Sequence, residues 1–362
     1  MARNDAFDGA RPAVATRVDN EPACAYALGA PRACGCMRVR CADFEVSEIL
    51  GFEPDGDGDH LLLHVQKEGI TTAELVAVVA RAAGLAPREI GYCGMKDRHA
   101  VARQWLSVPV AGQVAWNWSP KAAGPVKILA RTRHRRKLRR GSHRANAFKL
   151  RILELRGAQE DIDARLHRIA REGVPNYFGP QRFGCAGKNI ERADAMLRNV
   201  LRPRNHHVRG LYLSALRAWL FNAVLSARVA RGSWSRLLRG DCVMLDGTRS
   251  VFSIDDVDAE LAARAVTGDI HPTGPLCGTG TTMVHATARA IEEAVLDRHT
   301  AWRAGLARLG LRAARRALRM RVRELAWAWE SDASVRLSFT LDRGQFATSV
   351  VRECCAWTED NR

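Results

Sequence analysis

An alternation of apolar and polar residues near the C-terminal end of the sequence limits the possible folds more than any other feature. Residues 334–341 read SVRLSFTL, and a period of two residues is typical of a strand that buries one face. Comparable strand-like segments lie within residues 38–152, whereas residues 173–319 carry Arg-rich helical patterns. We therefore predict that residues 333–356 return to complete a sheet begun near the N-terminus, and that the middle of the chain is an insertion.

This pattern divides the chain into three parts. The 362 residues exceed one ordinary domain, and a predicted helix ends at Gly173, where the composition changes. We predict a sheet-containing α+β domain over residues 35–172 and 320–362, and an inserted α/β domain over residues 173–319. Residues 1–34 are rich in Ala, Arg and Asp without periodicity, which predicts a loose N-terminal extension.

Two local predictions concern the first part of the chain. Thr71 followed by Glu74 forms a capping box, so we predict a helix that starts there and ends at Gly84. Residues 38–50 and 60–66 are strand-like and flank a segment rich in Gly and Asp. This arrangement predicts that the two strands pair as a hairpin.

The charge of the chain points to a polyanionic partner. Lys and Arg number 56 against 39 Asp and Glu, a formal net charge of +17, and nucleic acid is the leading candidate for such a surface. Eight of the fourteen residues from 131 to 144 are Lys or Arg. Strand-like segments flank this basic run, so we predict that it contacts nucleic-acid phosphates, although a solvated surface remains the alternative. The arginines expected to make these contacts are Arg133, Arg135, Arg136, Arg139 and Arg140.

The sequence predicts no metal or nucleotide cofactor. The ten cysteines include no CxxC pair. The aspartates within residues 55–59 resemble the opening of a calcium loop, but His60 and Gln66 stand where that loop needs Gly and Glu. Residues 278–280 read GTG without the third glycine or the lysine of a phosphate-binding loop.

The sequence also predicts a cytoplasmic protein with no membrane segment. The most apolar segment, residues 75–86, contains Arg81 and is too short to span a bilayer. The N-terminus lacks the apolar region of a secretory signal, so we expect the thiols to stay reduced.

Asp97 is the candidate catalytic residue that local chemistry suggests. It lies in GYCGMKDRHAVARQW, residues 91–105, on the connection between two predicted strands, and loops on rigid scaffolds often carry catalytic groups. We expect the flanking Lys96 and Arg98 to keep the carboxylate ionised, which suits a nucleophile better than a general acid. A solvated aspartate that only forms a turn is the alternative.

Four separated motifs in this order resemble the TruD family of tRNA pseudouridine synthases, over residues 36–356. They are the segment around Asp97, the Asn146-Ala-Phe148 triplet, VPNYFGPQRFG at 174–184 and QFATSVVRE at 345–353. The resemblance implies a pseudouridine synthase domain with a mixed, mainly antiparallel sheet and an inserted TruD-specific domain. It implies isomerisation of uridine 13 of tRNA without a cofactor, by a protein that we expect to be monomeric.

By the same resemblance, Asp97 is the nucleophile and Phe44, Asn146 and Phe346 contact the substrate. Arg38 matches a basic position that could pair with the carboxylate. For VPNYFGPQRFG we favour a structural role over direct RNA contact. The sequence departs from the family at Asp342, where a proline is common. The alternatives are the same reaction on another structured RNA, or an RNA-binding protein without activity.

Overall fold

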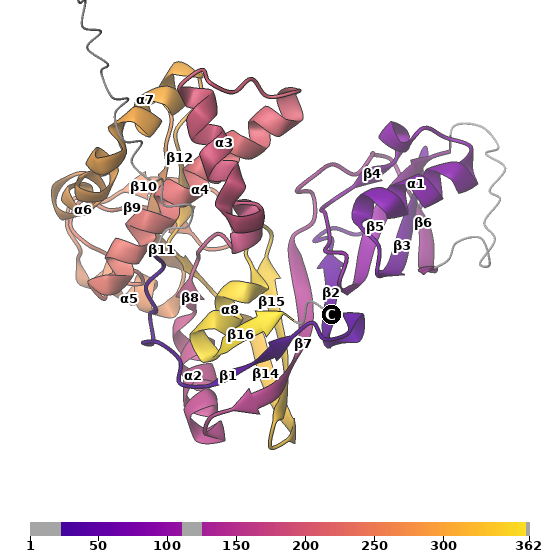
Figure 1. The fold of residues 1–362 in the computed structure, drawn as a ribbon, viewed down its shortest axis with the longest axis horizontal. Helices are drawn as coiled ribbons and strands as arrows, with labels where there is room; N and C mark the ends of the chain where they lie inside the picture. The colour runs from indigo at the N-terminus through magenta and orange to yellow at the C-terminus, as the bar shows by residue number, and fades with distance from the viewer. Residues whose placement is uncertain (1–22, 111–124, 360–362) are drawn as a thin grey trace, which may run out of the picture.

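The computed structural model describes residues 23–110 and 125–359 (Figure 1). One large sheet runs through the described chain. Along its main path the strands follow the order β14 (Arg323–Ser331), β15 (Ser334–Asp342), β7 (Ala145–Arg156), β2 (Phe44–Ile49), β5 (Val101–Pro109), β3 (His60–Glu68) and β6 (Val126–His134). Among the described strands of this path, β2 and β5 are the one parallel pair. The sheet is therefore mixed and mainly antiparallel, as the resemblance implies.

Three short strands extend this sheet. They are β1 (Cys34–Met37), which lies beside β7, β16 (Ala356–Glu359), which lies beside β1, and β4 (Gly91–Tyr92), which lies beside β5. Because β4 and β5 flank residues 93–100, the Asp97 loop connects two paired strands and is held at both ends.

The C-terminal strand joins the sheet where the alternation predicts. β15 pairs with β7 from Val335 opposite Ile152 to Asp342 opposite Ala145. Its apolar residues, Leu337 among them, are buried in the core that also holds the apolar side chains of β7. The prediction that residues far apart in the sequence complete one sheet is confirmed.

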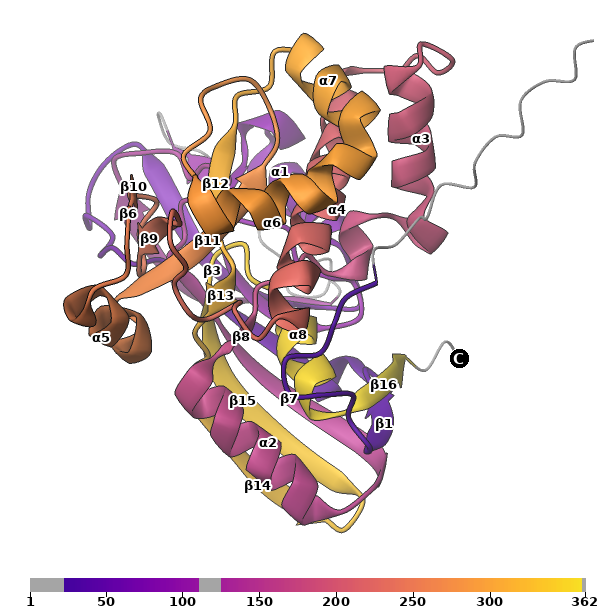
Figure 2. The same cartoon turned by 90° about the vertical axis from the view of Figure 1, so that its left-hand side faces the viewer.

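Two helices pack on this part of the sheet, α2 (Gln159–Glu172) and α8 (Ala347–Cys354). Figure 2 shows α2 lying along β14 and β15. Two indole nitrogens of β14, on Trp327 and Trp329, donate to the same carboxylate oxygen of Asp163 in α2, at 2.7 and 3.0 Å. These hydrogen bonds satisfy the polar ends of two large aromatic side chains and fix the helix on the sheet.

The predicted hairpin of β2 and β3 is wrong. β5 lies between them, parallel to β2 and antiparallel to β3. Most residues of β5 are buried, and its inner position pairs the backbone on both of its edges. The predicted helix at Thr71 is confirmed: α1 (Thr72–Ala83) begins with the reciprocal Thr71 and Glu74 hydrogen bonds and ends at Gly84, whose φ is +66°.

The middle of the chain forms a smaller sheet with helices around it. Its strands follow the order β10 (Val251–Ser253), β9 (Cys242–Leu245), β11 (Ile270–Leu276) and β12 (Ala314–Ala317). The helices are α3 (Lys188–Leu197), α4 (His206–Ala230), α5 (Ala259–Thr267), α6 (Ala286–Leu296) and α7 (Thr300–Arg308). A two-stranded ladder of β8 (Val174–Pro175) and β13 (Arg319–Met320) lies where the chain enters and leaves this region.

Residues 23–34 are packed against the rest of the protein, which corrects the prediction of a loose extension over residues 1–34. The backbone N–H groups of Ala27 and Leu28 donate to the buried Glu353 carboxylate of α8, at 3.0 and 3.2 Å. Arg165 of α2 donates to the carbonyls of Gly29 and Ala30. These partners are distant in sequence, so local composition could not reveal them. Residues 1–22 lie outside the described residues.

Within residues 23–110 and 125–359, no helix combines the length and the apolar character needed to cross a bilayer.

Candidate active site

Asp97 exposes its carboxylate at the end of the sheet where β5 begins. Its side chain is 47% exposed and forms an ion pair with Arg38, whose Nη2 lies 2.9 Å from Asp97 Oδ2. The Arg38 guanidinium also lies over the Phe44 ring, 4.1 Å from its centroid. The structure thus brings together three of the residues singled out by the sequence, with Arg38 between the aromatic ring and the carboxylate.

The backbone at Arg38 explains how this arginine reaches both groups. Arg38 follows β1 and has a φ of 59°, in the left-handed region that a residue with a Cβ rarely adopts. Its side chain is only 12% exposed. A rare conformation held by an ion pair and a ring contact is typical of a functional position.

The two cations next to Asp97 in the sequence point elsewhere, which corrects the expectation that they hold its carboxylate. Lys96 Nζ lies 3.1 Å from the Glu48 carboxylate, and Arg98 lies 2.7 Å from the Glu74 carboxylate on α1. Successive residues of an extended loop direct their side chains to different sides, so sequence neighbours need not share a partner.

Lys67 is a residue of the site that the sequence analysis missed. It is fully buried on β3, and its Nζ donates to the backbone carbonyl of Asp97 and, at 2.6 Å, to that of Ile70. Burial lowers the pKa of the Lys67 ammonium to about 8. The strand pattern could have predicted this burial. Leu63, Val65 and Lys67 alternate along β3 and share one face, and the first two are fully buried.

Four polar side chains form a buried group behind the Asp97 loop, which we call the Lys96 cluster: Lys96, Glu48, Asn146 and His143. Besides its ion pair with Glu48, Lys96 Nζ donates to Asn146 Oδ1 at 2.5 Å. Asn146 Nδ2 lies 3.4 Å from His143 Nε2. Burial raises the pKa of the Glu48 carboxyl, and the nearby Lys96 opposes that rise.

His143 makes the stability of the protein depend on pH. Burial, with repulsion from Lys96 and Arg343, lowers its pKa from 6.5 to about 4. As the pH falls, the unfolded chain therefore binds this proton first, so the stabilisation by neutral His143 is complete above pH 6.5 and is lost between 6.5 and 4. We expect about 2 kcal/mol of unfolding free energy to disappear between pH 7 and pH 5.

Urea unfolding at the two pH values measures this loss. His143→Gln, which removes the titrating group and leaves the other ten histidines, is expected to lose about 2 kcal/mol less than the wild type over the same interval. Equal losses in the two proteins would show that His143 does not carry the effect.

The two phenylalanines differ in their surroundings. Phe44 is buried, 4% exposed, and meets Phe148 edge to face at 6.1 Å. Phe346 is half-buried at the start of α8, and its ring lies 6.1 Å from that of Phe178. Phe178 belongs to VPNYFGPQRFG, whose Tyr177 is also buried and donates to the Ala25 carbonyl. That motif packs against the start of α8 and against the N-terminal segment at Ala25, consistent with a structural role.

The basic run spans the end of β6 and the turn that leads to β7. Arg135 is already paired with Asp57 through two hydrogen bonds of 2.9 and 3.1 Å, and Arg133 donates to the Gly58 carbonyl. Arg140 donates to the Tyr92 hydroxyl next to the Asp97 loop. Arg136 and Arg139 are exposed. The five arginines are therefore not equivalent, and Arg140 contacts the strand that leads into the Asp97 loop.

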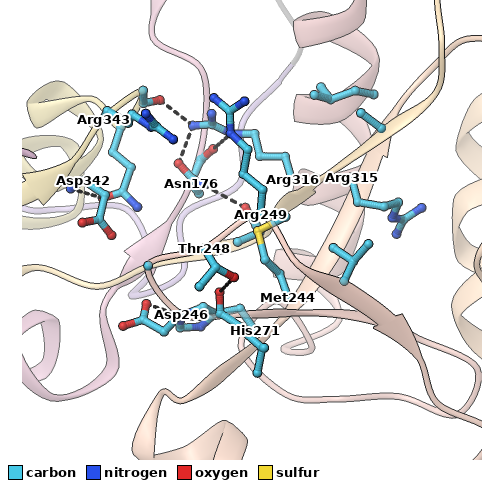
Figure 3. A pocket seen from close by; sticks show the side chains of 18 of the residues that line it. Asn176, Met244, Asp246, Thr248, Arg249, His271, Arg315, Arg316, Asp342 and Arg343 are labelled. Atoms are coloured by element: carbon cyan, nitrogen blue, oxygen red, sulfur yellow. Dashed lines mark hydrogen bonds and ion pairs between the residues drawn. The ribbon is translucent and has the colours of Figure 1, made fainter. Parts of the chain in front are cut away.

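A cavity of about 1240 Å³ lies between the smaller sheet and the turns beside β7 and β15 (Figure 3). Asp97 is not among its lining residues, whereas His143 of the Lys96 cluster is. Arg316 of β12 connects the two sides of the cavity: it donates to Asn176 Oδ1 at 2.5 Å and to the Gly344 carbonyl at 2.9 Å, and it lies 4.1 Å from the Phe178 ring centroid. The inserted region thus contacts the turn that carries Phe346.

Among the described residues, no three His, Cys, Asp or Glu side chains are placed to hold a metal ion together.

Comparison with known proteins agrees with this architecture. The family model for tRNA pseudouridine synthase D (TruD) matches residues 23–199 and 188–354. The chain is 43% identical to the tRNA pseudouridine synthase D of Methylococcus capsulatus, covering 88% of this chain and 90% of that protein. It is 39% identical to the protein of the same name from Hydrogenovibrio crunogenus, covering 91% and 95%.

A solved structure shows the same fold at lower identity. The crystal structure of a Methanosarcina mazei protein assigned to tRNA pseudouridine synthase D superposes with a TM-score of 0.68 at 18% identity, covering 91% of this chain and 95% of the other. With most of its length matched by the family model and by relatives of about 40% identity, the chain belongs to the tRNA pseudouridine synthase D (TruD) family.

Proposed function

We propose that this protein isomerises uridine to pseudouridine in tRNA, at position 13, with Asp97 as the nucleophile. The observation that carries the proposal is the exposed Asp97 carboxylate, paired with an arginine that lies on the Phe44 ring. A nucleophile needs an ionised carboxylate that the substrate can reach, and this arrangement supports both requirements.

The reaction needs no cofactor to balance. The Asp97 carboxylate attacks C1′ of the target uridine, and the electron pair of the N1–C1′ bond leaves with the uracil. The detached uracil turns, C5 attacks C1′ and displaces the carboxylate, C5 loses its proton, and N1 gains one. The product is an isomer of the substrate, so no oxidant, reductant or group donor is consumed.

The other sequence-derived residues have different parts in this proposal. Asn146 hydrogen-bonds the target base, and Phe346, half-buried beyond the end of β15, provides a stacking plane. Phe44, expected from the resemblance to contact the substrate, is buried and its ring is covered by the Arg38 guanidinium, so in this proposal it contributes through Arg38. Residues 35–172 and 320–362 form the catalytic domain, with residues 173–319 inserted. The protein acts as a monomer in the cytoplasm.

The basic run binds tRNA phosphates in this proposal, and its arginines offer a matched comparison. Arg136→Gln and Arg139→Gln are each expected to weaken tRNA binding and to reduce the slope of log Kd against log salt by about 0.7–0.9 for each phosphate that the variant no longer neutralises. Arg135→Gln removes the same charge, but Asp57 already pairs with Arg135, so we expect a smaller change. If the slope is unchanged in the first two variants, this surface is merely solvated.

Mapping of pseudouridines tests the function as a whole. RNA from cells that lack the protein is compared with RNA from cells that regain the wild-type protein or Asp97→Asn. We expect pseudouridine at tRNA position 13 to return with the wild-type protein alone. Return of pseudouridine only in another RNA would replace tRNA as the substrate. If no site changes, the protein is an RNA-binding protein without this activity.

A further inference from the structure

The Lys96 cluster determines which amide atom of Asn146 faces Lys96 and which faces His143. Lys96 Nζ lies 2.5 Å from one amide atom of Asn146 and 3.1 Å from Glu48 Oε1. An ammonium group only donates hydrogen bonds, so the Asn146 atom that faces it must be the oxygen. The side chains of Lys96 and Glu48 are 6% and 0% exposed, and an ion pair buried to this degree has no easy alternative arrangement.

The same reasoning continues to His143. With the oxygen of Asn146 committed to Lys96, the atom that faces His143 is the amide nitrogen, which only donates. His143 Nε2 must therefore accept, and the proton of the neutral ring lies on Nδ1. Burial, with repulsion from Lys96 and Arg343, lowers the pKa of His143, which agrees with a neutral ring.

Asn146 can therefore only donate a hydrogen bond to a ligand, and cannot accept one. Its oxygen is bound to Lys96 and one of its amide hydrogens faces His143. The second amide hydrogen remains for a ligand, on a side chain that is 8% exposed and lies beside the residue preceding Asp97. The positive charge behind the oxygen also polarises the amide and strengthens its donor side.

We propose that Lys96 is a positioning residue that holds Asn146 as a hydrogen-bond donor, so that the site selects a base with a carbonyl oxygen at the contacted position. This inference rests on the proposed function. Uracil offers carbonyl oxygens at C2 and C4, whereas cytosine has an amino group at C4. A donor fixed here also stabilises the negative charge that spreads onto the uracil oxygens when the base leaves C1′.

Thio-substituted tRNA identifies the contacted oxygen. Single-turnover rates are measured with uridine, 2-thiouridine or 4-thiouridine at the target position, since sulfur is a weak acceptor. We expect the wild type to slow about 10-fold or more with one of the two, and Asn146→Ala to be slower with uridine and insensitive to both. A wild-type enzyme that treats all three substrates alike overturns the proposal.

Two Lys96 variants separate positioning from simple packing. Lys96→Arg keeps a side chain that only donates, so the sensitivity to the thio substitution is expected to persist. Lys96→Gln, combined with Glu48→Gln to avoid a buried unpaired carboxylate, can donate or accept, so the sensitivity is expected to fall. tRNA affinity is expected to stay within about 2-fold in all variants, because distributed phosphate contacts supply most of it. If both variants lose the sensitivity equally, or both keep it, Lys96 does not set the orientation.

Nuclear magnetic resonance gives a readout that needs no activity. The ring-nitrogen spectrum of the 15N-labelled wild type, with His143 assigned by its absence in His143→Gln, is expected to show a protonated Nδ1 and an unprotonated Nε2 at pH 7. A protonated Nε2 would place the Asn146 oxygen toward His143 and overturn the proposal. Because this measurement requires no tRNA, it decides the orientation even if pseudouridine formation fails, which would count against the proposed function alone.

Discussion

Asp97→Asn is expected to bind tRNA with wild-type affinity and to form no pseudouridine. The amide has nearly the same shape as the carboxylate and can still accept a hydrogen bond from Arg38, which lies 2.9 Å from Asp97 Oδ2. It cannot attack C1′, so we expect the single-turnover rate to fall on the order of 10⁴-fold or more. The side chain is 47% exposed, and substitution at such a site should leave the melting temperature nearly unchanged.

Glu74→Gln is the matched control for this prediction. This variant also removes a carboxylate that pairs with an arginine of the Asp97 loop, because Glu74 lies 2.7 Å from Arg98. Glu74 itself lies on α1 and has no role in the proposed reaction. We expect this variant to keep turnover within a few-fold of the wild type. Measurable turnover in pure Asp97→Asn, free of contaminating wild-type enzyme, would remove Asp97 as the nucleophile.

Phe346→Ala is expected to lower turnover far more than tRNA affinity. Stacking of a base on an aromatic ring contributes about 1–3 kcal/mol, which corresponds to a rate loss of about 5- to 150-fold if the stacking persists in the transition state. The ring is half-buried and meets Phe178 edge to face. The loss of unfolding free energy is therefore expected to stay below the 3–5 kcal/mol typical of a fully buried phenylalanine.

Three measurements on one variant decide between stacking and packing: melting temperature, tRNA affinity and single-turnover rate. Phe52→Ala provides the comparison, because Phe52 is 36% exposed and stacks on His134, within the basic run. We expect it to leave the rate nearly unchanged. A large drop in melting temperature with a near-normal rate at low temperature would show that Phe346 is a core residue only.

The sequence predicted the helices and strands that are determined by neighbouring residues. The capping box at Thr71 and Glu74 places its own hydrogen bonds, so the start of α1 could be predicted directly. The alternation of residues 334–341 predicted β15, and the helical middle of the chain implied its return to the sheet. Such features depend on periodicity and on neighbouring residues, which a single sequence contains.

Features that depend on distant partners were missed or misjudged. The position of β5 between β2 and β3 depends on backbone pairing with both strands, and the sequence around the turn between β2 and β3 does not show it. The ion pair of Asp97 likewise comes from Arg38, 59 positions away, rather than from the adjacent cations. The resemblance to a family located Arg38 because it carries three-dimensional information that the spacing of residues lacks.

The pairing of β1, β7, β15 and β16 has a consequence for how the chain folds as it is made. One edge of β7, a strand of twelve residues, finds its partner in β15, which leaves the ribosome almost two hundred residues later. β1 pairs with β16, which is made later still. During that interval the edge of β7 is an open template for pairing with other chains. Release of residues 334–359 from the ribosome is therefore the step that pairs the open edge of β7, and slow synthesis of this segment would favour aggregation over folding.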